Sequence, residues 1–218
     1  MTEPPKLVLA SANPGKLIEL KRILKASDVP VAIVGLDQFP GAPDVAETGA
    51  TFAENALLKA HAIAEFTGLP AVADDSGICA EALNGMPGVL SARWSGRHGD
   101  DAANLALLLA QLADVPEERR GAFFAAAAAL VVPSGQEVVS EGTLHGRLIS
   151  EPRGTNGFGY DPIFVPEGES RTTAELSPAA KDAISHRGRA LRGLAPAIAE
   201  HVAGSPARDV PARDVPAS

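Results

Sequence analysis

Two adjacent acids are the most suggestive residues of this 218-residue chain. Asp74 and Asp75 directly follow the apolar run Ala71–Ala73, which predicts a strand, and open α/β sheets place ligands at the carboxyl ends of strands. Side chains alternate along a strand, so the two acids should point to opposite sides. One can then face a metal ion while backbone hydrogen bonds hold the other. Because Asp-Ser-Gly is also common turn chemistry, a turn without function fits the same residues.

The segment from Ser11 to Lys16 has the residue types of an anion site. Asn13 is a good N-cap and Pro14 a good first helical residue, so a helix should begin here after the strand Leu7–Ser11. Unpaired N–H groups at a helix N-terminus suit a phosphate, and Lys16 adds a positive charge one turn in. The spacing is not that of a Walker loop, and a capped helix with a solvated lysine also fits.

A second predicted helix carries two polar residues on one face. It opens with the capping-box pattern of Thr51 and Glu54, directly after Glu47-Thr48-Gly49, and ends near Gly68. Asn55 and Lys59 are four residues apart and therefore lie on the same side of the helix. That face could present polar groups to a cleft, although a helical lysine is more often a solvated surface charge.

The segment from Gly154 to Arg187 combines aromatic, acidic and basic residues. Phe158 and Tyr160 lie in a glycine-rich loop, where an aromatic ring could stack on a nucleobase, an interaction worth about 1–3 kcal/mol. The alternative is that both rings fill the core. His186 and Arg187 precede Gly188 and could present donors to a carbonyl oxygen, although a lone histidine is more often an ordinary surface residue.

Several kinds of catalytic site are excluded. The sequence contains no G-x-S-x-G, H-E-x-x-H or G-x-G-x-x-G pattern, which argues against a serine-hydrolase elbow, a zinc protease and a dinucleotide site. The single cysteine, Cys79, cannot form an internal disulfide or a four-cysteine zinc site. It is better read as a small core residue than as a nucleophile.

The first third of the chain alternates strand and helix, which predicts an α/β fold. Ala122–Val132 is ambiguous, because its alanines favour helix, yet a turn and the strand-like Glu137–His145 follow it. We therefore predict a β-hairpin there. The other expected elements are a strand at Val31–Gly35, an ordered loop at Gly85–Gly99, a helix at Asp101–Leu112, a strand at Pro162–Val165, a helix start at Ser177-Pro178, and a last helix from about His186 to Val202 that Pro196 kinks or ends early.

Composition limits the possible partners and location. Apolar residues make up 45% of the chain, enough for a packed core, and the formal net charge is −8. Such a field repels polyanions, so we expect no nucleic-acid or anionic-membrane partner, and a small anion must meet locally concentrated positive charge or a metal. The single thiol and the absence of a signal-peptide pattern favour the cytoplasm. The longest apolar run is too short to span a bilayer.

Six segments together resemble one family. In chain order they are Ser11–Lys16, Glu47–Lys59, Ala73–Gly77, Gly85–Arg93, Gly157–Pro162 and Ala183–Arg187. From Leu7 to about Val202 the chain is similar to the inosine triphosphate pyrophosphatase family. The resemblance implies an elongated α/β protein with a long mixed β-sheet flanked by helices, two lobes and a central active-site cleft. It also implies a homodimer that uses Mg²⁺ to hydrolyse ITP, dITP and XTP to the monophosphate and pyrophosphate.

The resemblance also implies roles for individual residues. Asp75 is the catalytic general base, and Glu47 and Asp75 belong to the metal site. The phosphate-binding positions are Ser11, Asn13, Lys16, Lys59 and Ser76, and the nucleoside-binding positions are Phe158, Gly159, Tyr160, Asp161, Lys181, His186 and Arg187.

Two other functions stay open at this point. One is a pyrophosphatase of the related family that acts on pyrimidine or modified nucleotides, and the other is a nucleotide sensor without turnover. We expect one two-lobed domain over residues 1–204. The segment 205–218 repeats a five-residue unit without apolar periodicity, so we expect it to be disordered.

Overall fold

The computed structural model describes residues 4–203, and the repeated C-terminal segment lies outside the described residues. The described residues form a six-stranded sheet in the order β2-β1-β3-β4-β5-β6. Its strands are β1 (Lys6–Leu9), β2 (Ala32–Val34), β3 (Ala71–Ala80), β4 (Gly121–Val131), β5 (Glu137–Leu148) and β6 (Phe164–Pro166). β1 pairs in parallel with β2 and β3, and the other neighbours are antiparallel. The predicted α/β class with a mixed sheet is confirmed.

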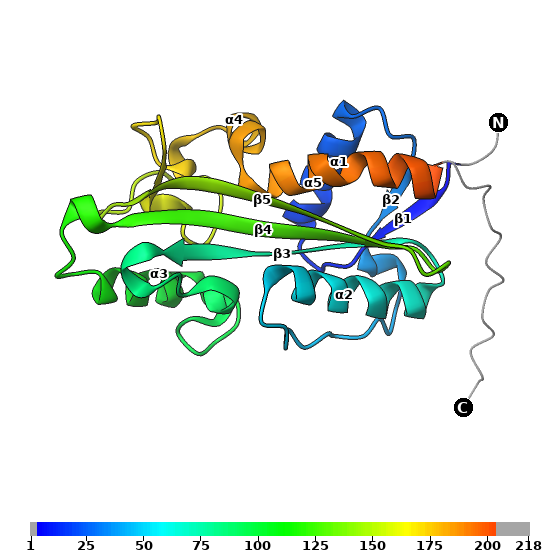
Figure 1. The fold of residues 1–218 in the computed structure, drawn as a ribbon, viewed down its shortest axis with the longest axis horizontal. Helices are drawn as coiled ribbons and strands as arrows, with labels where there is room; N and C mark the ends of the chain where they lie inside the picture. The colour runs from blue at the N-terminus through cyan, green and yellow to red at the C-terminus, as the bar shows by residue number, and fades with distance from the viewer. Residues whose placement is uncertain (1–3, 204–218) are drawn as a thin grey trace.

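Helices cover both faces of this elongated sheet (Figure 1). On one side lie α1 (Pro14–Ala26), α4 (Pro178–Ile184) and α5 (His186–Ile198), and on the other lie α2 (Phe52–Thr67) and α3 (Asp101–Gln111). One apolar cluster joins α1 and α5 to the sheet, a second packs α2 against the opposite face, and a third fills the end near α3. None of the described helices has the length and apolar character needed to cross a membrane.

Short helical turns connect these elements. They are η1 (Leu36–Gln38), η2 (Glu81–Leu83), η3 (Gly88–Arg93), η4 (Glu117–Arg119), η5 (Asp161–Ile163), η6 (Thr173–Glu175) and the π-helical turn η7 (Ala199–Ala203). The glycine-rich segment 85–99 is thus an ordered loop that contains η3. The last α-helix continues through Pro196 but stops at Ile198, so the part expected up to Val202 belongs to the π turn.

The expected strand Ala71–Ala73, with the two acids at its carboxyl end, is wrong. β3 continues to Ala80 because β4 pairs with it along its whole length. Its other neighbour, β1, makes its last pair between Leu9 and Val72. The acids therefore lie in the middle of β3, just beyond the carboxyl end of the parallel strand β1, so one edge of β3 is no longer covered by β1 beside them.

The predicted hairpin is confirmed, since β4 and β5 pair antiparallel across the turn after Val132. Successive alanines of β4 face opposite core clusters, and their small side chains admit helices on both faces. α5 packs so closely on β5 that a Cβ at Gly142 would lie 2.2 Å from the carbonyl oxygen of His186. The strand expected at Pro162–Val165 instead begins at Phe164, because Pro162 lies in a 3₁₀ turn and has no N–H for a ladder.

Candidate active site

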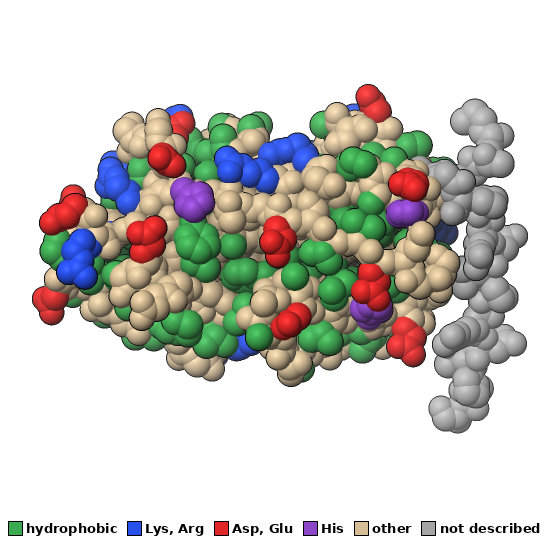
Figure 2. Space-filling model, viewed as in Figure 1, with side chains coloured by type: hydrophobic (Ala, Val, Ile, Leu, Met, Phe, Trp, Pro, Cys, Tyr) green, Lys and Arg blue, Asp and Glu red, His purple; other side chains and the backbone are tan. Residues whose placement is uncertain are grey.

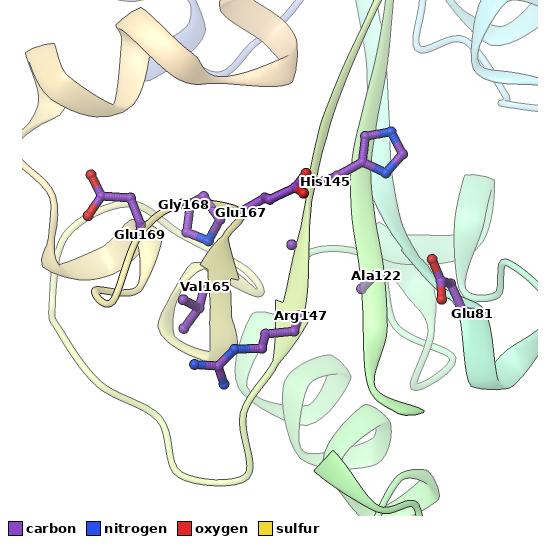
Figure 3. A pocket seen from close by; sticks show the side chains of 10 residues that line it. Glu81, Ala122, His145, Arg147, Val165, Glu167, Gly168 and Glu169 are labelled. Atoms are coloured by element: carbon purple, nitrogen blue, oxygen red, sulfur yellow. The ribbon is translucent and has the colours of Figure 1, made fainter. Parts of the chain in front are cut away.

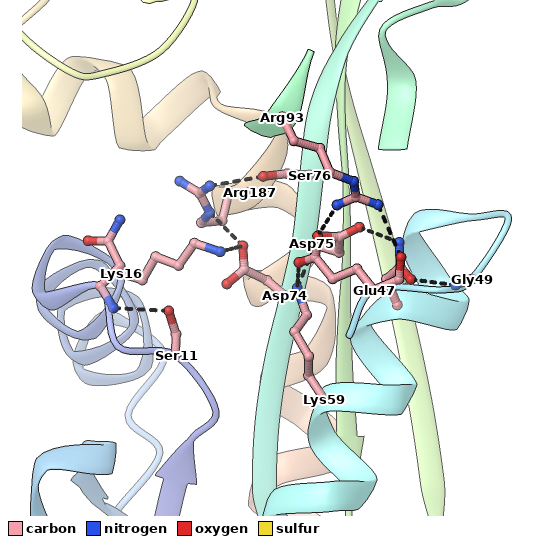
Figure 4. A network of polar contacts seen from close by, with 12 residues as sticks. Ser11, Lys16, Glu47, Gly49, Lys59, Asp74, Asp75, Ser76, Arg93 and Arg187 are labelled. Carbon is pink, nitrogen blue, oxygen red and sulfur yellow. Dashed lines mark hydrogen bonds and ion pairs between the residues drawn. The ribbon is translucent and has the colours of Figure 1, made fainter. Parts of the chain in front are cut away.

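The candidate site is centred on the middle of β3, where the side chains of Asp74 and Asp75 point to opposite sides, as the strand alternation predicts (Figure 4). Asp74 faces α1 and α5, and Asp75 faces α2 and the segment that carries Glu47. Both carboxylates are buried. Asp74 pairs with Lys16 and Arg187, and Asp75 pairs with Lys59, so β3 separates two charged clusters.

On the first side, two cations hold Asp74. Its Oδ2 accepts from Arg187 Nε at 2.9 Å and lies 3.0 Å from Lys16 Nζ. The expectation that backbone hydrogen bonds would hold the second acid is therefore corrected, because side-chain cations do so. Burial alone would raise the pKa of Asp74, but Lys16 and Arg187 outweigh it and hold that pKa well below its usual range.

The same cluster contains a buried glutamate, Glu19 of α1. Its Oε2 accepts from Arg187 Nη1 at 3.3 Å, and Ser76 Oγ accepts from Arg187 Nη2 at 3.0 Å. Burial raises the pKa of Glu19 and lowers that of Lys16. Sequence reasoning gave Glu19 no role, although it lies three residues after Lys16 and so shares its helical face.

On the second side, Lys59 bridges two carboxylates. Its Nζ lies 3.0 Å from Asp75 Oδ1 and 2.9 Å from Glu47 Oε1. Asn55 Nδ2 donates to Asp75 Oδ2 at 3.1 Å. Burial raises the pKa of Asp75, Lys59 opposes this, and the negative charge of Glu47 adds to the rise. The predicted polar face of α2 is thus directed at the acids.

Local structure explains how α2 presents these groups. Thr51 Oγ1 accepts from Glu54 N at 3.1 Å and Glu54 Oε2 accepts from Thr51 N at 3.2 Å, which is the predicted capping box. Gly49 N donates to Asn55 Oδ1 at 2.8 Å, so the segment before α2 folds back over its first turn. A Cβ at Gly49 would lie 2.7 Å from Glu54 Cβ, and this close approach favours glycine.

Glu47 has another partner that sequence reasoning left without a role. Arg93, the last residue of η3, donates to Glu47 Oε2 at 2.9 Å and to the Glu47 carbonyl oxygen at 3.0 Å. Burial favours a raised pKa for Glu47, but Lys59 and Arg93 together lower it. No short-range pattern could have found this contact, because the two residues are 46 positions apart.

The predicted phosphate-binding turn at the start of α1 is formed as expected. Asn13 caps the helix by accepting from Gly15 N at 2.8 Å, and Asn13 N donates to Ser11 Oγ at 3.2 Å. The turn lies on the Asp74 side of β3, next to Lys16 (Figure 4). It therefore joins the charged cluster around the acids, and its contact with phosphates stays a prediction.

The two aromatic residues of the second glycine-rich loop have different surroundings. Phe158 is 51% exposed, with Lys181 Nζ at 5.2 Å and Arg187 Cζ at 5.5 Å from its ring centroid. Tyr160 is buried, and its hydroxyl donates to the Ser91 carbonyl oxygen at 2.9 Å. Filling the core is thus the correct interpretation for the Tyr160 ring, whereas the Phe158 ring is open to a ligand.

Asp161 organises this loop. Its Oδ2 accepts from Phe158 N at 2.8 Å and from Lys181 Nζ, and its Oδ1 accepts from Thr173 Oγ1 at 2.8 Å. A Cβ at Gly157, where φ is +76°, would lie 2.1 Å from Asp161 Oδ2, so this position requires glycine. The next turn is held by Gly159 N, which donates to Asp101 Oδ2 at 3.0 Å.

His186 is buried, so the surface interpretation is wrong. Its ring stacks on Phe124 with centroids 4.7 Å apart, and its Nδ1 has no hydrogen-bond partner within residues 4–203. Burial, with the nearby positive charges of Arg187 and Lys181, lowers the pKa of His186 well below 6.5. The neutral imidazole therefore prevails at physiological pH.

The donor set fits a magnesium ion. Glu47 and Asp75 converge on one point, because the single ammonium group of Lys59 binds both carboxylates. No group of three His, Cys, Asp or Glu side chains placed to hold a metal occurs within the described part of the chain. Mg²⁺ prefers oxygen ligands and commonly takes one or two carboxylates together with water and substrate phosphates. Two carboxylates are thus sufficient for an ion that arrives with a nucleotide.

A separate pocket lies at the β5–β6 end of the sheet (Figure 3). Glu81, Glu167 and Glu169 line it together with His145 and Arg147, and none of the predicted site residues does. Three carboxylates against one guanidinium are a poor setting for a triphosphate, so we do not assign the nucleotide site to it.

Comparisons with known proteins agree with this geometry. The sequence profile of the Ham1 family matches residues 7–197. The chain belongs to the Ham1 family. Among curated Ham1 relatives, the dITP/XTP pyrophosphatase of Streptomyces coelicolor is 63% identical over 195 residues, which cover 89% of this chain and 98% of the relative. The resemblance inferred from the sequence is thereby confirmed.

Solved structures of Ham1 proteins share the fold. The dITP/XTP pyrophosphatase of Mycobacterium abscessus has a TM-score of 0.73 at 61% identity, covering 88% of this chain and 99% of that one. A HAM1 protein from Coxiella burnetii has a TM-score of 0.82 at 42% identity, covering 90% and 99%. The family assignment thus extends over nearly all of the described residues.

Proposed function

We propose that this chain hydrolyses aberrant purine nucleoside triphosphates, namely ITP, dITP and XTP, to the monophosphate and pyrophosphate, and so cleans the nucleotide pool. The observation that carries the proposal is the convergence of Asp75, Glu47 and Lys59 at the centre of β3. Relatives more than 60% identical over nearly their whole length carry the name dITP/XTP pyrophosphatase. Because the match covers 98% of each of these relatives and 89% of this chain, the same reaction is the natural assignment.

Local positive charge makes this reaction compatible with a net charge of −8. On the face shown in Figure 2, acidic side chains are scattered along the molecule rather than gathered. Around β3, in contrast, Lys16, Lys59 and Arg187 lie within reach of two acids. Phosphoryl transfer needs mainly positioning and charge stabilisation, and the cations on the two sides of β3 are placed to supply both. We assign Lys16 and Lys59 to the phosphates, which requires both to turn from their present carboxylate partners.

Mg²⁺ is part of the proposal, with Glu47 and Asp75 as its protein ligands. When bound, the ion neutralises phosphate charge and lowers the pKa of a coordinated water. The ammonium group of Lys59 lies between the same two carboxylates, so a cation is already accommodated there.

Asp75 is proposed as the base that takes a proton from the attacking water. Burial and the neighbouring Glu47 raise its pKa, which brings the carboxylate closer to the basicity that proton transfer at neutral pH requires. Asn55 holds Asp75 Oδ2 and thereby fixes the direction of the carboxylate. Attack of the water at the α-phosphorus would break the bond to the β-phosphate bridge and release pyrophosphate.

Base recognition is assigned to the loop of Phe158 and to His186. The exposed Phe158 ring offers a stacking surface, and His186 Nδ1 lacks a partner within the described residues. Hypoxanthine and xanthine carry a 6-oxo acceptor where adenine carries an amino donor, and a mispaired buried donor costs about 1–3 kcal/mol. Arg187 is bonded to Asp74, Glu19 and Ser76, so we assign it first to holding the acidic cluster.

The deciding experiment is pyrophosphate release from ITP, dITP, XTP, ATP and GTP, with Mg²⁺ and with a chelator. We expect turnover of the first three, little of ATP and GTP, and none with chelator. Preference for a pyrimidine or modified nucleotide would favour the related pyrophosphatase family, and binding without turnover would favour a sensor. The family resemblance also implies a homodimer, which sedimentation of the purified protein would test. The single cysteine favours the cytoplasm, which fractionation of cells would test.

A further inference from the structure

Arg93 is the feature of the site that the reaction scheme above does not use. Its guanidinium donates to both the side chain and the main chain of Glu47, at 2.9 and 3.0 Å. In Figure 4 it reaches Glu47 from the side opposite to Lys59. A planar guanidinium presents two donor nitrogens in a fixed geometry, so each of the two Glu47 oxygens has its own donor, whereas a lysine would have to share one nitrogen between them. The contact therefore favours arginine.

The segment that carries Glu47 needs such a support. Residues 42–49 have no regular secondary structure, so no ladder or helix fixes the Glu47 backbone. Within residues 4–203, the side chain of Glu47 is bound by Lys59 and Arg93 only. Lys59 is shared with Asp75, whereas both of these Arg93 hydrogen bonds go to Glu47.

The turn that carries Arg93 is fastened to β3. Ser91 Oγ accepts from Ile78 N of β3 at 3.0 Å, and within η3 it donates to the Gly88 carbonyl oxygen at 2.6 Å. At Gly77 a Cβ would lie 2.4 Å from that same carbonyl oxygen, so η3 lies as close to the strand as glycine permits. Arg93 therefore lies only two residues after Ser91, the residue through which η3 is bonded to β3, and β3 also carries Asp75.

Substrate binding would affect the two partners of Glu47, Lys59 and Arg93, differently. If Lys59 turns to the phosphates, as proposed above, Glu47 loses that hydrogen bond and keeps the two from Arg93. Arg93 is then the cation left beside it. We propose that Arg93 is a positioning residue that keeps Glu47 oriented as a metal ligand while Lys59 serves the nucleotide. This inference rests on the proposed function.

The test compares Arg93→Met and Arg93→Lys with Arg97→Met. Arg97 is a matched control, because its side chain is 86% exposed and its one ion pair within residues 4–203 is a 3.9 Å contact with Asp100. The readouts are binding of Mn²⁺ alone, followed by electron paramagnetic resonance, and the Mg²⁺ concentration for half-maximal pyrophosphate release. We expect Arg93→Met to lower the affinity for Mn²⁺ by about 10–100-fold and to raise the half-maximal Mg²⁺ concentration by a similar factor. This is the usual effect of removing a hydrogen-bond partner of a metal ligand. Arg93→Lys should recover part of the loss, and Arg97→Met should match the wild type.

A double-mutant cycle with Glu47→Gln separates positioning from general structural support. If Arg93 acts through Glu47, adding Arg93→Met to Glu47→Gln changes metal binding and turnover little further. Wild-type metal binding in Arg93→Met, or effects that multiply in the double mutant, would overturn the inference. Should Arg93→Met not fold, the cycle is run with Arg93→Lys. Failure of the proposed function is a different result, because wild type would then release no pyrophosphate, whereas the Mn²⁺ comparison needs no turnover.

Discussion

At the scale of single residues, the contacts around Asp75 suit its proposed role as the base. Its carboxylate is buried, one oxygen is bound by Asn55 and the other by Lys59. Asp75→Asn keeps this shape but removes the proton acceptor, so we expect kcat to fall by about 10²–10⁴-fold with nucleotide binding largely kept. Steady-state pyrophosphate release and equilibrium binding of ITP measure the two effects. Asp114→Asn, at an exposed position, is the control. Near-normal turnover of Asp75→Asn would remove Asp75 from the role of base.

Phe158 is a second residue whose environment predicts its behaviour. Its exposed ring lies beside two cations and fills no core, so its removal should leave the fold intact. Loss of a base-stacking surface costs about 1–3 kcal/mol, so Phe158→Ala should raise KM about tenfold or more with a smaller change in kcat. Phe158→Tyr should restore most of the affinity. Leu107→Ala, at a similarly exposed apolar position on α3, should leave KM unchanged. An unchanged KM in Phe158→Ala would show that the base binds elsewhere.

At the scale of elements, local signals correctly predicted where several helices begin or end and where the hairpin turns. The capping box and Gly68 define α2, Asn13 and Pro14 start α1, and the turn after Val132 reveals the hairpin. The length of β3 could not be predicted in the same way, because Asp74–Gly77 reads locally as a turn and is held extended by β4. The partner of Asp74 was equally hidden, since Arg187 lies 113 positions away and no local period relates them.

The packing of η3 on β3 gives a prediction at this scale. In Gly77→Ala the new Cβ would lie 2.3 Å from Ser91 Oγ and 2.4 Å from the Gly88 carbonyl oxygen. Overpacking of this kind costs about 1–3 kcal/mol, which denaturant unfolding measures. Adding Ser91→Ala should not restore stability, because the backbone oxygen stays in place. Metal binding should weaken as well, since η3 carries Arg93.

A matched glycine provides the control for that experiment. In Gly193→Ala the Cβ would lie 2.2 Å from Ser140 Oγ and otherwise only 3.4 Å from Ser140 Cβ. Here the obstacle is one hydroxyl, so Ser140→Ala should relieve it, and alanine is a better helix former than glycine. We therefore expect Ser140→Ala to restore the stability of Gly193→Ala, and Ser91→Ala not to restore that of Gly77→Ala. Rescue of both would mean that the Gly88 backbone can yield.

At the scale of the whole molecule, the long strands β3 to β5 connect two charged clusters to three apolar ones. β3 separates the Asp74 cluster from the Asp75 cluster, so opposite charges are satisfied in pairs on each face and the net charge of −8 lies elsewhere. Protonation of any buried member therefore affects the stability of the entire fold as well as the site.

His186 is a buried group whose ordinary pKa of 6.5 lies in an accessible pH range. Burial first, and then Arg187 and Lys181, lower its folded pKa well below the value of 6.5. The unfolded chain therefore binds a proton near pH 6.5 that the folded protein refuses. A group with a depressed folded pKa stabilises the fold above its unfolded pKa and loses that contribution as pH falls. The free energy of unfolding should thus decrease from about pH 7 towards pH 5, by at most about 1.4 kcal/mol per pH unit from this residue.

Replacement of the imidazole tests this argument. His186→Phe keeps an aromatic ring against Phe124 and cannot be protonated. In the wild type the centroids of the His186 and Phe124 rings are 4.7 Å apart. We expect its unfolding free energy, measured in urea at half-unit steps from pH 8 to pH 5, to depend less steeply on pH than that of the wild type. The exposed His98 is the control, and His98→Gln should keep the wild-type slope. If His186→Phe shows the same slope as the wild type, acidic destabilisation must come from the carboxylate clusters, and the imidazole would be protonated with little penalty inside the fold.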